Sequence, residues 1–173
     1  MLNWLRVALV LFTATVLQIG LLSDLRIAGV SADLLLAVTV AAGLTGGPNA
    51  GAAVGFAAGL IFALFLPTPL GLSAFAYCLT GYLVGLVENA LVRTAWWISI
   101  LFTIGGVAFG TSLYILIGEL VGQSQLFSDD TLKVIIIVSL YSAIFAPLCV
   151  WAMGWALGRS STPRPQRLRV VMN

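Results

Sequence analysis

Histidine is absent from the 173 residues, and charged residues make up only 8% of them. Without histidine, the chain lacks the most common general base of enzymes and the most common metal ligand. A soluble domain carries roughly 25% charged residues, so this chain has too little polar surface to cover itself in water. The net charge of +2 is small, and we expect no nucleic-acid partner.

Cysteine is scarce as well, and both Cys78 and Cys149 lie inside long apolar runs. Disulfides need an oxidising aqueous compartment, so we expect two small buried hydrophobic side chains instead. No serine nucleophile motif is present. Asp129 and Asp130 are neighbours in a polar segment, which is typical of solvated acids and not of a protease dyad. The sequence therefore predicts no catalytic residue, no metal and no cofactor, and a protein that is not an enzyme.

Apolar residues dominate what is present: 61% of the chain is hydrophobic, and the mean hydropathy is +1.11. A helix needs about 20 apolar residues to cross a membrane. The pattern predicts an all-α, polytopic integral membrane protein with about six transmembrane helices. The second run is short, so the second and third runs are alternatively a re-entrant hairpin. The predicted runs are 4–22, 27 or 33 to 44, 49–66, 70–91, 96–121 and 133–157.

Short breaks rich in polar residues, glycine and proline separate these runs. Residues 1–158 are predicted to form a single transmembrane domain, and residues 159–173 a disordered basic cytoplasmic tail. The breaks are 23–26, 46–49, 67–69, 92–94 and 122–131.

The distribution of basic residues predicts the orientation, because cytoplasmic segments of membrane proteins are enriched in arginine and lysine. An even number of crossings puts both termini on one side. If that side is the cytoplasm, six basic residues lie inside and two outside, which favours this orientation. The inside residues are Arg6, Arg93, Arg159, Arg164, Arg167 and Arg169, and the outside residues are Arg26 and Lys133.

Glycine recurs every fourth residue along the third run. Residues four apart share one helix face, and glycine on such a face lets helix backbones approach closely in lipid. Two interpretations stay open: packing among the helices of this chain, or the binding of a partner helix. The residues of this predicted interface are Gly47, Gly51, Gly55, Gly59, Gly81 and Gly85.

Three acids are candidate functional residues. Intramembrane carboxylates often mark function, and Glu88 and Glu119 lie within or near predicted spans. Both are close to a span end, where solvation explains them equally well; the alternative is contact with a substrate or a partner. Asp33 stands directly before the second run and is the third candidate.

The stretch around Asp33 resembles the rod shape-determining protein MreD family of bacteria. The resemblance covers about a third of the chain at the level of motifs, and the length, helix count and basic tail also agree. Two departures are Ala32, where the family often has proline, and Ala63, where it often has an acid. The matching residues are Gln18, Asp33-Leu34-Leu35-Leu36, Gly47, Gly51, Gly55-Phe56, Gly59-Leu60, Pro69-Leu70-Gly71 and Gly81-Tyr82-Leu83.

The resemblance implies a non-catalytic subunit of the bacterial cell-elongation machinery in the cytoplasmic membrane. Its expected partners are MreC first, then the actin-like MreB, the glycosyltransferase RodA and a class B transpeptidase, together with membrane lipid. Such a subunit would scaffold the synthesis of side-wall peptidoglycan through contacts between helices.

The family is also similar in fold to the substrate-binding subunits of energy-coupling-factor vitamin transporters. The alternative function is therefore a membrane subunit for small-molecule uptake. Those subunits carry small residues four apart on the first helix. Here Ala8 is followed at that spacing by Phe12, and Ala14 by Gln18, so the pattern is absent.

Overall fold

The computed structural model describes residues 2–20, 33–65, 71–90, 96–120 and 131–158. They form five helices, which confirms the predicted all-α class. The ends of α1, α3, α4 and α5 each lie within two residues of the ends of the corresponding predicted runs. The helices are α1 (Leu2–Gly20), α2 (Leu34–Ala63), α3 (Leu72–Ala90), α4 (Trp96–Leu120) and α5 (Thr131–Ala156).

Four of the helices in this described part are long and apolar enough to cross a membrane. They are α1, α2, α4 and α5, where the length of α2 includes both sides of a bend at Gly47, whereas the apolar stretch of α3, Leu72–Val87, is shorter. The predicted breaks at 23–26, 67–69 and 92–94, nearly all of 122–131 and the tail 159–173 lie outside the described residues.

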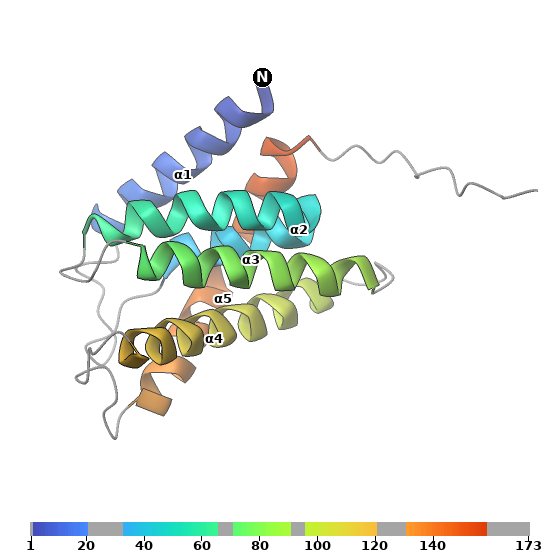
Figure 1. Ribbon diagram of the computed structural model, residues 1–173. Coiled ribbons are helices and arrows are strands. Elements are labelled where there is room, and N and C mark those ends of the chain that lie inside the picture. Colours follow the sequence, from blue (N-terminus) through green and yellow to red (C-terminus); the bar gives the residue numbers. More distant parts are fainter. Residues whose placement is uncertain (1, 21–32, 66–70, 91–95, 121–130, 159–173) are drawn as a thin grey trace, which may run out of the picture.

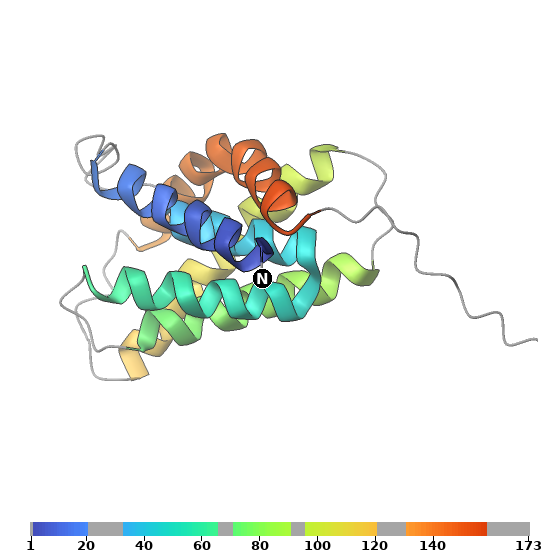
Figure 2. The ribbon, with the colours of Figure 1, turned by 90° about the horizontal axis from the view of Figure 1, so that it is seen from above.

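α2 is sharply bent at Gly47, where φ is 79° and ψ is −174°. A side chain at this backbone conformation would be strained, so glycine is required. Pro48 follows, and its missing amide hydrogen costs nothing in the first turn of a helix. A Cβ on Gly51 would lie 2.8 Å from the Cα of Gly43, so the parts before and after the bend pack side by side. Figure 2 shows the two parts running in opposite directions.

We call residues 34–46 the first arm of α2 and residues 48–63 its second arm. At a rise of about 1.5 Å per residue, the first arm is about 20 Å long and the second about 24 Å. The hydrocarbon core of a membrane is about 30 Å thick. The second and third predicted runs thus form one helix that bends back on itself, with arms shorter than this thickness.

The first arm is the centre of the molecule. Residues 34–44 are all buried, and the sequence there is apolar on every side, as a helix surrounded by others requires. α2 contacts α1, α3, α4 and α5, and Figure 1 shows them arranged around it.

The outward faces of the helices are apolar, and those of α1 and α5 are the clearest. Their exposed large side chains recur at intervals of three or four residues, as on one helix face. A soluble protein rarely exposes such continuous apolar surface, whereas a lipid bilayer covers it. The exposed large side chains that follow this spacing are Leu5, Leu9, Phe12, Val16 and Ile19 on α1, and Ile136, Leu140, Ile144, Leu148, Trp151 and Trp155 on α5.

Candidate functional site

The glycines predicted as an interface lie where the second arm of α2 meets α3. A Cβ on Gly51 would lie 2.7 Å from the carbonyl carbon of Gly81, and one on Gly55 would lie 2.8 Å from that of Tyr77. Near the bend, a Cβ on Gly85 would lie 2.5 Å from the nitrogen of Pro48. Real Cβ atoms essentially never come this close to other atoms. The two helices therefore touch backbone to backbone along their length.

This contact continues at Gly59, where a Cβ would lie 2.5 Å from the Cα of Ala74. A separate close approach joins α4 to the first arm of α2, where a Cβ on Gly106 would lie 2.9 Å from a methyl group of Val40. All of these neighbours belong to the same chain. A partner helix would have to displace the chain's own helices to reach the glycine faces, so its docking surface has to be sought on other faces.

Asp33 forms the cap of the first arm of α2. Its carboxylate accepts a hydrogen bond from the backbone nitrogen of Leu36 at 2.9 Å, which is the usual bond of an aspartate N-cap. The other carboxylate oxygen accepts a hydrogen bond from the hydroxyl of Tyr77 on α3. One acid thereby fixes the start of the central helix and ties it to α3.

Other helices contribute polar side chains to the same place. The backbone nitrogen of Leu35 donates to Oε1 of Gln18 on α1 at 3.1 Å. The backbone nitrogen of Asp33 donates to Oγ of Ser142 on α5 at 3.2 Å. We call Gln18, Asp33, Tyr77 and Ser142 the Asp33 cluster. It joins four helices around the start of the first arm.

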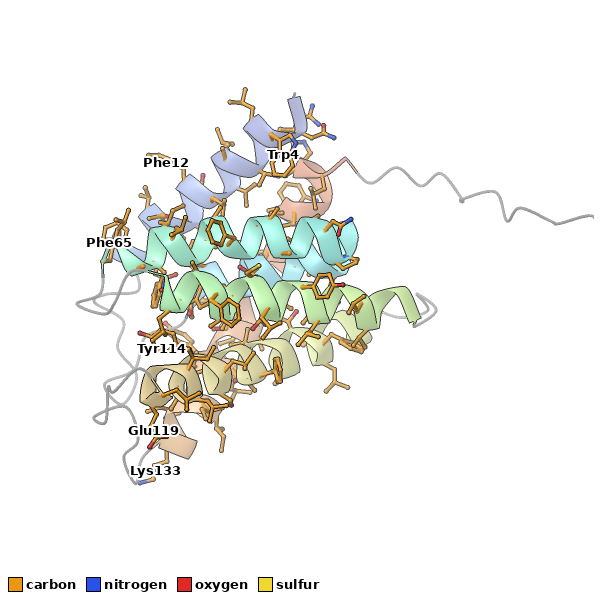
Figure 3. All side chains as sticks on the ribbon, in the orientation of Figure 1. Trp4, Phe12, Phe65, Tyr114, Glu119 and Lys133 are labelled. Atoms are coloured by element: carbon orange, nitrogen blue, oxygen red, sulfur yellow. The ribbon has the colours of Figure 1, made fainter. Side chains whose placement is uncertain are left out.

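Two further hydroxyl groups lie near the Asp33 cluster, that of Tyr114 in space and that of Ser73 along α3. Tyr114 on α4 is half-buried, with its hydroxyl buried, and it is near enough to interact electrostatically with Tyr77. Figure 3 labels it between α3 and α4. Ser73 precedes Tyr77 by one helical turn, on the same face of α3, and its buried Oγ has no hydrogen-bond partner among the described residues. Polar groups thus gather at this end of an otherwise apolar bundle.

The physical need for the cluster follows from where the helix begins. The first four N–H groups of a helix have no partner within it, and leaving such a group unbonded away from water costs about 1–3 kcal/mol. Gln18 satisfies Leu35, the Asp33 carboxylate satisfies Leu36, and the Asp33 carbonyl accepts from Ala37 at 3.1 Å. Burial disfavours a charged carboxylate, while these donors and the helix N-terminus favour it. The bonds to Leu35, Leu36 and Ala37 therefore have a structural role, because they satisfy the first N–H groups of the helix.

The cluster brings together a carboxylate, a phenol, an amide and a serine hydroxyl. No group of three or more histidines, cysteines or acids comes together within the described ranges. Cys78 is half-buried and Cys149 is buried, and both are free thiols.

The three acids singled out in the sequence have different surroundings. Asp33 is the centre of the cluster, whereas Glu119 is exposed near the end of α4 and takes no part in it. Glu88 lies near the end of α3, and its side chain is outside the described residues. Sequence reasoning missed Tyr77 and Ser142, and only the family resemblance drew attention to Gln18. In the sequence, the position of Asp33 directly before an apolar run was the feature that indicated a helix N-cap.

Comparison of the chain with family models, with curated proteins and with solved structures found no match.

Proposed function

We propose that this chain is a non-catalytic membrane subunit of the bacterial cell-elongation machinery, of the MreD kind. It would sit in the cytoplasmic membrane with both termini in the cytoplasm. Its role would be to hold MreC and, through the same complex, MreB, RodA and a class B transpeptidase in place for side-wall peptidoglycan synthesis. Six crossings, or four and a re-entrant hairpin, are both compatible with this orientation.

One observation carries the proposal. Most residues behind the resemblance to MreD come together in a single structural unit, made of the two arms of α2 and α3. Asp33 caps the unit, residues 34–44 form its buried centre, and the glycines allow its backbone contacts. The shared residues are therefore those that determine the architecture, which is the part a family would hold in common.

The architecture also supports a scaffold function more than that of a receptor for a soluble ligand. The glycine faces are occupied within the chain, so the surfaces left for partners are the outward apolar faces. In lipid, such faces associate with other helices by close packing. The single membrane helix expected of MreC suits a surface of this kind.

Crosslinking in living cells tests this partner. A photo-activatable amino acid would be introduced at exposed positions of α2, α3 and α4, and MreC would be detected in the products. The same photo-activatable amino acid introduced at Ile144, on the outer face of α5, serves as the comparison. We expect crosslinks to MreC on one of the two surfaces and not on both, because a single helix covers one face. The positions on α2, α3 and α4 are Phe56, Phe75, Leu101 and Phe109.

Depletion of the protein gives the functional readout. Cells that lose the scaffold should widen or round up, because side-wall synthesis loses its organisation, while their need for metabolites stays the same. Depleted cells that keep their shape but become dependent on a vitamin would overturn the proposal.

The second candidate is a substrate-binding subunit of a small-molecule uptake transporter. The Asp33 cluster favours it, since several convergent polar groups in an apolar protein are typical of ligand sites. Binding assays on the purified protein separate the two functions. A vitamin that binds the wild type and not Asp33→Ala would support the transporter subunit.

A further inference from the structure

The first turns of α1 and the last turn of α5 bring a cation against an aromatic surface. The guanidinium carbon of Arg6 lies 5.0 Å from the centre of the Trp155 ring. The amide nitrogen of Asn3 would lie 3.9 Å from a Cβ on Gly158, just beyond α5. Figures 1 and 2 both show the beginning of α1 beside the end of α5. Gln18 of the Asp33 cluster lies twelve residues further along α1, so this site is at the other end of the helix.

The charge of Arg6 has no carboxylate partner among the described side chains. Asp33 is bonded to Tyr77 and Leu36, and Glu119 is exposed near the end of α4, in the part of Figure 3 far from Trp4. A cation–π contact attracts the guanidinium but leaves its positive charge in place. Arginine presents a planar set of N–H donors that matches the oxygens of a phosphate.

Next to the charged Arg6, the exposed face of α5 is first aromatic and then aliphatic. Trp155 is 50% exposed and Trp151 is 70% exposed, and tryptophan is enriched where a membrane meets water. The same face of α5 continues through Leu148 and Ile144, which are 56% and 67% exposed. This order matches a phospholipid, with a phosphate at one end and an acyl chain along the rest.

We propose that Arg6, Trp155 and the adjoining face of α5 bind one anionic phospholipid. The phosphate would sit on the Arg6 guanidinium, and an acyl chain would lie over Trp151, Leu148 and Ile144. A net negative headgroup is favoured over a zwitterionic one because no described carboxylate neutralises Arg6. The orientation expected from the arginines puts this site in the cytoplasmic leaflet, where anionic lipids contribute a negative surface potential.

Lipid retention by the full chain tests the site. The protein would be delipidated in mild detergent and titrated with phosphatidylglycerol or with phosphatidylcholine of the same acyl chains, and bound lipid would be counted by native mass spectrometry. Arg6→Gln is compared with Lys133→Gln, which changes the net charge equally and lies at the start of α5. We expect phosphatidylglycerol binding to weaken about fivefold in Arg6→Gln and to stay at the wild-type level in Lys133→Gln. The basic tail is present in all three proteins and cancels in the comparison.

A purely structural role of Arg6 gives a different result. If Arg6 only braced α1 against α5, Arg6→Gln would lower the Tm equally with and without phosphatidylglycerol. Our proposal predicts that this lipid raises the Tm of the wild type and of Lys133→Gln, and that Arg6→Gln loses the rise. Inorganic phosphate alone should not raise it. Equal retention of both lipids by the wild type, or equal retention of phosphatidylglycerol by the two variants, would overturn the site.

Discussion

A single methyl group at Gly51 should weaken the contact between α2 and α3. In Gly51→Ala the new Cβ would lie 2.7 Å from the carbonyl carbon of Gly81 and 2.8 Å from the Cα of Gly43. Both neighbours are backbone, so no side chain can rotate away, and the helices have to separate. Overpacking of this kind costs about 1–3 kcal/mol. The higher helix propensity of alanine offsets about 1 kcal/mol of that.

Gly105→Ala on α4 is the matched control. A Cβ at Gly105 meets nothing within 4 Å, so only helix propensity acts, and the variant should gain up to about 1 kcal/mol. We expect Gly51→Ala to lose up to about 2 kcal/mol net. Because helix propensity acts equally in both variants, they should differ by the overpacking cost of about 1–3 kcal/mol. This corresponds to roughly 2–12 °C in Tm, at about 2–4 °C per kcal/mol.

Thermal unfolding of the purified variants in one detergent measures this difference, with aggregation followed by size-exclusion chromatography. The same chemical change is made in both proteins, so differences in detergent binding are small. If Gly51→Ala and Gly105→Ala unfold at the same temperature, the backbone contact between α2 and α3 is not what holds these helices together.

The remaining predictions concern larger changes and the orientation. Gly55→Leu should accumulate poorly in the membrane, because its side chain would enter the backbone of Tyr77 and the methyl group of Thr39; normal levels of both Gly55→Leu and Gly59→Leu on immunoblots would refute the packing. Tyr77→Phe should lower the free energy of unfolding by about 1–3 kcal/mol by removing the donor to Asp33, whereas Tyr82→Phe, at a residue 40% exposed, should change it little in the same denaturation assay. Of cysteines introduced at Ser124 and Ser161, only the one at 124 should react with a membrane-impermeant reagent added to intact cells, and labelling of 161 would reverse the orientation.

Much of the architecture follows from the pattern of apolar runs. The ends of α1, α3, α4 and α5 were predictable because polar residues or breakers flank each run, and these act locally. The spacing of Gly51, Gly55 and Gly59 correctly indicated one helix face. What covers that face depends on how helices far apart in sequence meet, which spacing alone does not determine.

The bend of α2 and the cluster at its start show where sequence reasoning ends. Gly46-Gly47-Pro48 indicated a turn, but how closely the two arms of α2 pack after the turn depends on their tertiary contacts. Asp33 stood out as an acid before an apolar run, while Ser142 follows it by 109 residues and looked like any serine in a span. Long-range hydrogen bonds leave no mark in the local sequence, so the partners of Asp33 needed the structure.

Affinity purification of the tagged protein from mild detergent, with identification of the proteins that accompany it, tests the proposed function most directly. The wild type and Gly105→Ala should bring down MreC together with members of the elongation machinery, and Gly51→Ala should bring down less in proportion to its lost stability. Recovery of an energy-coupling transporter complex in place of MreC would contradict the scaffold function.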